Sequence, residues 1–264
     1  MVVKFCPLFS GSSGNSTFIS YKNTKILVDC GCNFKRIKES LCQIDEDIFE
    51  LDAVFLTHSH SDHTSALPVI LKNLPNCYVV GSLGTLLSLN LGRSEYKSKI
   101  CTTEINKEYS FKDLVMDAFF VPHDADETVG YNIKAGSKSI SLLTDIGHLE
   151  ESLYANVTGK DLVFLEANHD INTLENCSYP HFLKQRILSD YGHLSNENAG
   201  IFAADLIRRG VTKIILGHLS GEANTSDLAF STVRDVLAGN DINVGNDVAL
   251  SVSPRGMLGE VVCF

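Results

Sequence analysis

One short segment of the chain concentrates side chains that can bind metal ions: His58-Ser59-His60-Ser61-Asp62-His63. Three imidazoles and one carboxylate fall within six positions, and both groups are common ligands of zinc, manganese and iron. The apolar run Leu51–Thr57 before the segment predicts a buried β-strand, and residues 64–72 after it predict a helix. The segment therefore lies at the carboxyl end of a strand, where α/β proteins place their active sites.

The order of the ligands within this segment predicts two metal ions. Side chains alternate along a strand, so His58 and His60 point the same way and can bind one ion. Asp62 and His63 follow the turn and are better placed for a second ion. A water molecule that bridges two such ions becomes a hydroxide nucleophile near neutral pH. We therefore expect hydrolytic chemistry.

Length and composition allow one large domain, and we expect it to span residues 1–264. The chain is 44% hydrophobic and can bury a substantial core. No apolar run approaches a membrane span and no export signal is visible, so we expect a cytoplasmic protein with reduced cysteines. The net charge of −10 argues against broad coating of nucleic acid, although two divalent ions can make the active site itself positive.

Short predicted strands alternate with helices along the chain. Apolar runs predict strands at residues 2–9, 16–21, 25–29, 53–57, 78–81, 115–122, 129–135, 139–144, 162–166, 213–216, 248–252 and 259–264. Helices are predicted at residues 34–42, 66–74, 83–91, 149–156, 182–188, 196–208 and 227–237. The first three strands follow one another as a meander, which excludes a simple parallel βα repeat. Two sheets between outer layers of helices fit this order best.

The segment at 58–63 resembles the His-x-His-x-Asp-His hallmark of the metallo-β-lactamase superfamily. Residues 10–16 (Ser-Gly-Ser-Ser-Gly-Asn-Ser), 166–170 (Glu-Ala-Asn-His-Asp) and 192–196 (Gly-His-Leu-Ser-Asn) are similar to its WalJ/YycJ (VicX) group of small bacterial proteins. The resemblance implies a four-layer αββα sandwich of two mixed β-sheets flanked by helices. It also implies a dinuclear, nuclease-like hydrolase with 5′-to-3′ exonuclease activity, whose phosphodiester substrates would be DNA or RNA ends.

The resemblance also implies the remaining metal ligands, each at the end of a predicted strand. His123 precedes Gly130-Tyr131, as in the phosphodiesterase branch of the superfamily, while Asp145 and His218 end two later apolar strands. The implied coordination is as follows: His58, His60 and His123 bind the first ion, Asp62, His63 and His218 bind the second, and Asp145 bridges both. Zinc is the first choice for these two divalent ions, with manganese or iron as alternatives.

Two residues are expected to act in catalysis. Asp62 would hold the bridging hydroxide by a hydrogen bond. His193 stands where the phosphodiesterase branch carries a histidine that is not a ligand, and an imidazole is well suited to protonate a leaving group as general acid. One alternative stays open: His193 could be a metal ligand, with His218 outside the coordination shell.

Softer signals suggest residues that bind substrate. Ser195 and Asn196, at the start of the predicted helix 196–208, could offer backbone N–H groups to a phosphate or merely cap the helix. Ser13 and Asn15 lie in a segment that could cradle phosphate or form a tight turn. His169 could line the pocket or orient a ligand from outside the coordination shell. The place of His148 stays open.

Other functions would use the same ligands. A thioester or other small-ester hydrolase of the glyoxalase II kind also needs a dinuclear site. A metal-binding regulatory module is suggested by the genetic association of the WalJ/YycJ group with a cell-wall two-component system. The complete set of ligands favours an enzyme, because a regulatory module has no physical need for an open dinuclear site. We therefore expect a metal-dependent phosphodiesterase or nuclease.

Overall fold

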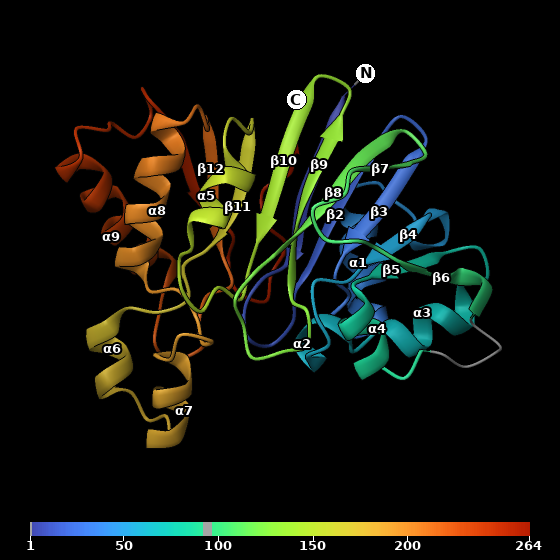
Figure 1. The fold of residues 1–264 in the computed structure, drawn as a ribbon, viewed down its shortest axis with the longest axis horizontal. Coiled ribbons are helices and arrows are strands. Elements are labelled where there is room, and N and C mark those ends of the chain that lie inside the picture. The colour runs from blue at the N-terminus through green and yellow to red at the C-terminus, as the bar shows by residue number, and fades with distance from the viewer. Residues whose placement is uncertain (1, 92–96) are drawn as a thin grey trace.

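The computed structural model describes residues 2–91 and 97–264. Within these ranges, two seven-stranded β-sheets lie face to face, and helices cover their outer faces (Figure 1). The two termini lie together at the end of the sandwich opposite α2, α6 and α7, three short helices whose bounds are given below. The layers thus follow the order αββα, and the prediction of the fold class is confirmed.

Both sheets are mixed, with antiparallel strands followed by parallel ones. The first contains β1 (Val3–Phe9), β2 (Ser16–Tyr21), β3 (Thr24–Val28), β4 (Ala53–Phe55), β5 (Tyr78–Gly81), β6 (Ile100–Thr102) and β14 (Val262–Cys263). The second contains β7 (Tyr109–Phe111), β8 (Leu114–Phe120), β9 (Val129–Ala135), β10 (Lys138–Leu143), β11 (Leu162–Glu166), β12 (Lys213–Gly217) and β13 (Ala249–Val252). The spatial orders are β14-β1-β2-β3-β4-β5-β6 and β13-β12-β11-β10-β9-β8-β7. As predicted, β1 to β3 form an antiparallel meander, whereas β3 to β6 and β10 to β13 run parallel.

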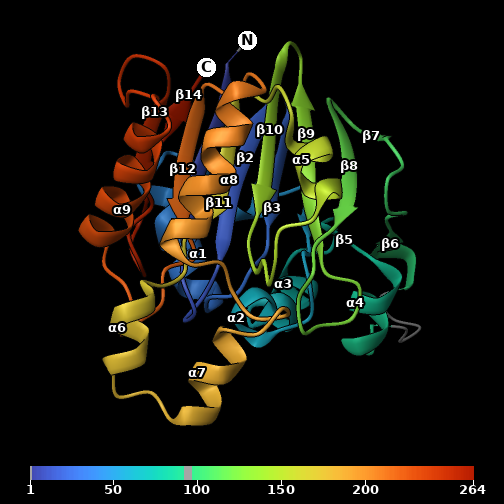
Figure 2. The same cartoon turned by 60° about the vertical axis from the view of Figure 1, so that its left-hand side comes forward.

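The helices form two outer layers and a cluster at the lower end of the sandwich (Figure 2). The first sheet is covered by α1 (Phe34–Gln43), α3 (Leu67–Asn73) and α4 (Leu83–Ser88), and the second by α5 (Glu151–Val157), α8 (Asn196–Arg208) and α9 (Ser226–Gly239). The lower end carries α2 (Ser61–Thr64), α6 (Ile171–Asn176) and α7 (His181–Ile187). Short 3-10 helices span Ile48–Glu50 and Lys97–Lys99. None of the described helices is long and apolar enough to cross a membrane.

Three large apolar clusters hold the four layers together. Phe5 from β1 and Tyr131 from β9 belong to the cluster between the two sheets. Cys6 and Leu8, whose side chains point to the other face of β1, belong to the cluster between the first sheet and its helices. Phe202 of α8 belongs to the cluster on the outer face of the second sheet. This alternation along β1 is the period of two that a strand buried on both faces requires.

The sequence placed some boundaries wrongly near the metal-binding segment. The predicted strand 51–57 ends at Phe55, and a separate short helix, α2, precedes α3, which lies within the predicted helix 66–74. The first change lets the residues after Phe55 leave the sheet and approach the second sheet. Neither β6 nor β7 was predicted, because three residues carry too little periodicity to be recognised. The eight cysteines are all free thiols.

Candidate metal centre

The candidate ligands follow strands of both sheets and meet at one edge of the sandwich. His58 and His60 follow β4, His123 follows β8, Asp145 follows β10 and His218 follows β12, all at the carboxyl ends of these strands. The remaining two, Asp62 and His63, lie in α2. Parallel strands bring their carboxyl ends to the same edge, which explains how ligands 160 residues apart in sequence become neighbours.

Two of these ligands leave their strands in an unusual backbone conformation. Asp145 has a φ of 62° and His218 a φ of 57°, a region that costs a non-glycine residue roughly 1–3 kcal/mol. Hydrogen bonds hold the turn at His218: its N–H donates to Ser10 Oγ at 2.6 Å, and Asn168 Nδ2 donates to its carbonyl at 2.8 Å. The strained backbone turns both side chains out of the sheet into the shared site.

One group of three imidazoles can hold the first ion. His58, His60 and His123 each offer a nitrogen, and these nitrogens lie within 4.8 Å of one another. The Nδ1–H of His123 donates to the carbonyl of Gly192 at 3.1 Å, which leaves its Nε2 free as a ligand. His58 Nδ1 lies 3.0 Å from the hydroxyl of Thr57. Both rings are therefore oriented before any ion binds.

A second group can hold the other ion, and Asp145 lies between the two groups. Asp62, His63 and His218 bring ligand atoms within 4.8 Å of one another. Oδ1 of Asp145 is 3.6 Å from Nε2 of both His123 and His218, and its Oδ2 is 3.2 Å from Nε2 of His63. The carboxylate of Asp145 thus faces ligands of both groups, as a bridging ligand must.

Buried atoms without partners show that the site fits metal ions. Nε2 of His58, His123 and His218 and Oδ2 of Asp145 are buried and have no hydrogen-bond partner among the described residues. An unsatisfied buried polar atom costs about 1–3 kcal/mol, so four within one cluster would be difficult to maintain. Imidazole nitrogens and a carboxylate oxygen are the donor atoms that divalent transition metals prefer. The cluster therefore suits divalent metal ions.

The local electrostatics keep several ligands in the protonation state that metal binding requires. Burial opposes ionisation of Asp145, but the surrounding imidazoles, with His218 and His63 foremost, hold its pKa well below the usual range. Burial, with a contribution from His63, lowers the pKa of His58 well below its usual value. Burial also lowers the pKa of His123. An ionised Asp145 and neutral imidazoles at His58 and His123 are the forms that bind metal.

Two ligands are instead protonated when no metal is bound. Burial alone would lower the pKa of His63, but Asp145 and Asp29 outweigh it and raise this pKa to about 9. Burial likewise opposes protonation of His218, but Asp145, Asp62 and Glu166 raise its pKa well above the usual value. Binding of a metal to these two rings must therefore displace protons.

Asp29 supports the site, although it was not among the residues predicted from the sequence. It follows β3 with a φ of 61°, and its Oδ2 accepts hydrogen bonds from His63 Nδ1 at 2.8 Å and from the hydroxyl of Thr57 at 2.9 Å. These bonds direct Nε2 of His63 toward Asp145. Its place directly after a buried strand is a signal that it shares with Asp145, which the family resemblance also pointed to.

Glu166 is the second supporting residue that the sequence did not reveal. This carboxylate at the end of β11 is completely buried. Its Oε1 accepts from His193 Nδ1 at 2.8 Å and from His218 Nδ1 at 2.7 Å. Its Oε2 accepts from the backbone N–H groups of Ile146 and Leu194. Burial raises its pKa, but the two imidazoles, led by His193, outweigh this and lower it to about 2.

His193 lies at the margin of the metal cluster. Its ring centroid is 5.2 Å from those of both His123 and His218, and its Nδ1 is 3.8 Å from Oδ1 of Asp145. The closer contact of Nδ1 is with Glu166. His193 also belongs to a group, with Asp145, Glu166 and His218, that could hold a metal ion. Its hydrogen bond to Glu166 through Nδ1 leaves Nε2 as the ring nitrogen that is free to donate a proton.

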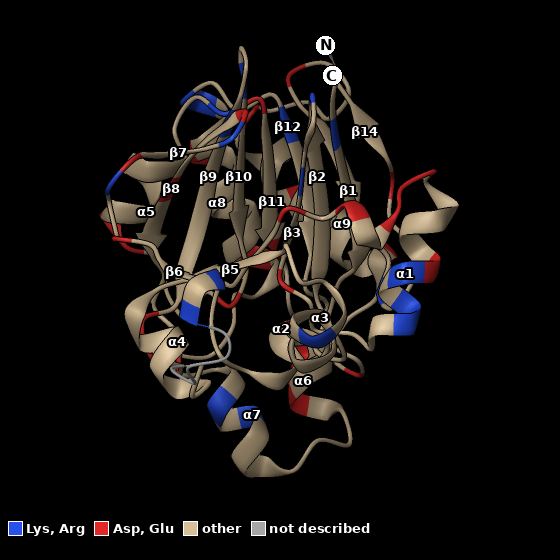
Figure 3. Ribbon diagram, turned by 90° about the vertical axis from the view of Figure 1, so that its right-hand side faces the viewer, with Lys and Arg blue, Asp and Glu red and all other residues tan. Residues whose placement is uncertain are grey.

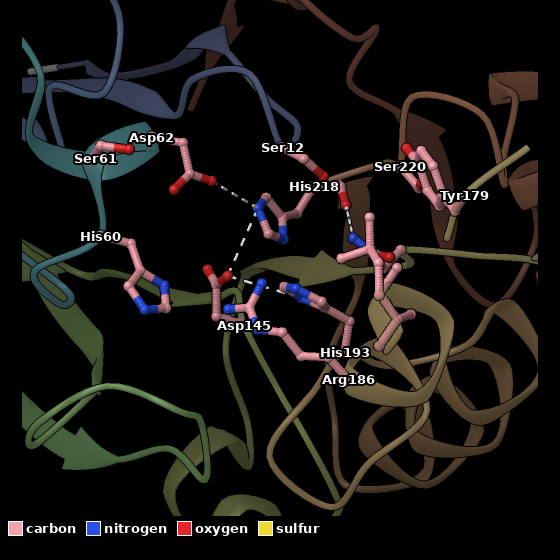
Figure 4. Close-up of a pocket in the computed structure, with 13 residues that line it drawn as sticks. Ser12, His60, Ser61, Asp62, Asp145, Tyr179, Arg186, His193, His218 and Ser220 are labelled. Atoms are coloured by element: carbon pink, nitrogen blue, oxygen red, sulfur yellow. Dashed lines mark hydrogen bonds and ion pairs between the residues drawn. The ribbon is translucent and has the colours of Figure 1, made fainter. Parts of the chain in front are cut away.

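A cavity of about 310 Å³ opens onto the cluster (Figure 4). Its walls include Asp62, Asp145 and His193, together with the guanidinium-bearing side chain of Arg186 from α7. Arg186 forms a two-point ion pair with Asp124, at 2.5 Å through Nε and 2.8 Å through the second nitrogen. Figure 3 shows that α7 carries basic residues at this end of the molecule. The cavity thus combines metal ligands with a fixed positive charge.

The residues expected to bind substrate occupy different environments. Ser13 is exposed and does not line the cavity, whereas its neighbour Ser12 does. Asn15 supports the site from the side: its Oδ1 accepts from the N–H of Gly11, and its Nδ2 is 2.9 Å from Nε2 of His63. Side chains alternate with a period of two along a strand and 3.6 along a helix, but a loop has no such period. The sequence therefore could not tell whether Ser12 or Ser13 faces the cavity.

The residues around the start of α8 form a separate environment beside the metal cluster. Ser195 caps α8, and its hydroxyl accepts from the N–H of Asn198. Asn196 does not face a cavity; it is fully buried and its side chain bonds with Asn224, because the cap turns it inward. His169 and His148 lie outside the metal cluster in an adjoining cleft, which Ser195 also lines.

Comparisons with known proteins show the family of this chain. A model of the beta-lactamase superfamily domain matches residues 24–218. Exodeoxyribonuclease WalJ of Streptococcus pneumoniae is 36% identical over 249 residues, which cover 92% of this chain and 91% of that protein. Exodeoxyribonuclease YycJ of Bacillus anthracis is 31% identical over 247 residues, 93% of each chain. The metallo-beta-lactamase fold protein YhfI of Bacillus subtilis, at 16% identity, has a TM-score of 0.75 over the full length of both chains. This chain therefore belongs to the metallo-β-lactamase superfamily, in the group that contains WalJ and YycJ.

Proposed function

We propose that this chain is a metal-dependent phosphodiesterase that removes nucleotides from the 5′ ends of DNA. The observation that carries the proposal is a cluster of seven candidate ligand side chains, four of which line an open cavity that also contains an arginine. The names of WalJ and YycJ, both exodeoxyribonucleases, favour DNA over other phosphodiesters. The free cysteines fit a reducing compartment such as the cytoplasm.

The ligand set would hold two divalent ions. His58, His60 and His123 would bind one, and Asp62, His63 and His218 the other, with Asp145 shared. Imidazole-rich sites of this kind suit zinc first and manganese or iron as well. Bound there, the ions would supply an activated water and a positive field that stabilises charge on the phosphoryl group.

Two side chains would manage the protons of the reaction. The carboxylate of Asp62 lines the cavity, where it would accept a hydrogen bond and then the proton from the attacking water. The bond from phosphorus to the 3′ oxygen of the terminal nucleotide breaks as the new bond to the water oxygen forms. His193, with its Nδ1–H bonded to Glu166, would deliver a proton from Nε2 to that leaving oxygen.

Arg186 would position the phosphate. Its guanidinium lines the cavity, and Asp124 holds it in a two-point ion pair. A planar guanidinium with free N–H groups binds phosphate oxygens with defined geometry. An anionic substrate therefore fits this cavity better than a neutral thioester does.

A substrate panel tests the proposal. The protein is loaded with zinc, manganese or iron and offered end-labelled DNA, bis-p-nitrophenyl phosphate, a lactoylglutathione thioester and nitrocefin. We expect mononucleotides from DNA ends, weak activity on the last two compounds, and no DNA hydrolysis by Asp145→Ala. Asp205→Ala, which removes an exposed carboxylate on α8, is the matched control and should retain activity. Dominant thioester cleavage with phosphodiesters untouched would refute the proposal.

A further inference from the structure

A second cleft adjoins the metal cavity, and His193 forms part of the wall of both. This cleft has a volume of about 320 Å³ and lies among the loops that follow β10, β11 and α7 and the start of α8. The ring that would protonate the leaving oxygen thus stands where the two cavities meet. The part of a substrate that carries this oxygen must lie next to His193, and therefore beside the second cleft.

The lining of the second cleft suits a flat, uncharged group. Ile171 and Leu188 expose 40% and 49% of their surface and supply apolar contact. The ring of His169 is only 1% exposed, yet its Nδ1 has no hydrogen-bond partner in the described part of the chain. Burial lowers the pKa of His169 to about 4, so the ring is neutral at pH 7. A neutral imidazole with an unused nitrogen can bond to the edge of a base.

The charge of the second cleft is unsuitable for a phosphate. Its described lining contains no lysine or arginine, but it does contain Asp190. The scissile phosphate therefore belongs in the metal cavity with Arg186, and the uncharged parts of a nucleotide, its base and sugar, belong in the second cleft. Ligand pockets range from about 300 Å³ upward, so this cleft can hold one nucleoside and not a run of nucleotides.

We infer that the second cleft binds the nucleoside that carries the leaving oxygen, which is the terminal nucleoside of the DNA strand. This inference rests on the proposed phosphodiesterase activity and adds a binding site to it. Contacts with the base and sugar would place the 3′ oxygen beside His193, and a site one nucleoside deep would limit each cut to the last nucleotide. Binding remote from the reacting bond is a general means of orienting that bond.

Obstruction of the cleft by tryptophan tests the inference. Leu188→Trp fills the rim, and Ile171→Trp is a second obstruction from another segment. Ile201→Trp on α8 is the matched control, because Ile201 is also 49% exposed and lies outside the lining of both cavities. Equilibrium dialysis with deoxyadenosine, which carries no phosphate, measures binding to metal-loaded protein without any turnover. Kinetics of mononucleotide release from DNA are measured in parallel.

We expect both obstructing variants to keep their metal content while losing at least tenfold in affinity for deoxyadenosine and in kcat/KM on DNA. Ile201→Trp should match the parent in all three measurements. Nuclear magnetic resonance of the parent should show the His169 ring nitrogens shifting as deoxyadenosine is added, which needs no variant at all. Unchanged His169 signals and equal deoxyadenosine binding by parent and variants would overturn the inference. A parent that hydrolyses no phosphodiester would instead count against the proposed function, and the binding data would still report on the cleft.

Discussion

Replacement of Glu166 by glutamine should disable the site without altering its shape. In the parent, each carboxylate oxygen of Glu166 accepts two hydrogen bonds. Oε1 accepts from Nδ1 of His193 and of His218, and Oε2 accepts from two backbone N–H groups. The amide nitrogen of glutamine cannot accept. It must face either the two backbone donors, at a cost of about 1–3 kcal/mol for each unsatisfied buried group, or the two imidazoles.

The second orientation of the glutamine changes the tautomers of both rings. If Nδ1 of His218 becomes an acceptor, its proton moves to Nε2, the atom that faces Asp145 and the metal site. Loss of an orienting partner of this kind weakens metal binding roughly 10–100-fold, or about 1.4–2.8 kcal/mol. His193 would also lose the carboxylate acceptor that orients its ring through Nδ1. We therefore expect weaker metal binding and a further loss of turnover.

Chelator competition measures the metal affinity of Glu166→Gln, and DNA hydrolysis at saturating metal measures what remains of turnover. Glu151→Gln, at an exposed position on α5, is the control and should resemble the parent. Metal affinity within a factor of two of the parent, together with unchanged turnover, would show that Glu166 does not orient His218 and His193. A thermal melt of Glu166→Gln shows whether the variant is folded, so that unfolding is not mistaken for weaker metal binding.

Three further results are expected. His193→Ala should keep both metals but lose roughly 10²–10⁴-fold in turnover. The loss should shrink for p-nitrophenyl esters, whose leaving group departs without a proton. If His193→Ala is depleted of metal while His218→Ala is fully loaded, then His193 is the ligand and His218 is not. Arg186→Ala should raise KM for DNA at unchanged metal content, while Arg234→Ala, an exposed arginine on α9, should not; equal KM values would remove Arg186 from substrate binding. Metal binding at pH 7.5 should release roughly two protons, because the pKa values of His63 and His218 are raised and both rings must become neutral to bind metal. Calorimetry in buffers of different ionisation enthalpy measures this release, and a release of no protons would contradict the reasoning.

The sequence predicted most of the fold because its strands and helices are locally consistent. β2, β5, β9, β11 and α8 begin and end at the predicted residues. The candidate ligands were selected because they follow apolar strands, either in the His-x-His-x-Asp-His segment or at positions that the family resemblance implies. This selection rests on signals within a few residues of each ligand, and the ligand set stays a prediction.

The supporting residues could not be found because their partners are distant in the sequence. Glu166 contacts His193 and His218, which are 27 and 52 residues away, and Asp29 contacts His63, which is 34 residues away. A single carboxylate after a strand does not identify a partner at such a distance. The surroundings of Asn196 could not be predicted for a related reason: its side chain bonds with Asn224, 28 residues away on the loop before α9. Packing between segments, not local pattern, decides these positions.

The number of metal ions per chain tests the central claim most directly. Elemental analysis of protein purified without added metal, and again after loading with zinc, manganese or iron, gives this number for the parent, His58→Ala and Asp145→Ala. We predict two ions in the parent and loss of high-affinity binding in both variants. Asp145 faces both groups of ligands, and the ligand nitrogen of His58 groups both with His60 and His123 and with His63 and Asp145. A parent that holds close to no metal, even after loading with each of the three ions, would contradict the dinuclear site and the mechanism built on it.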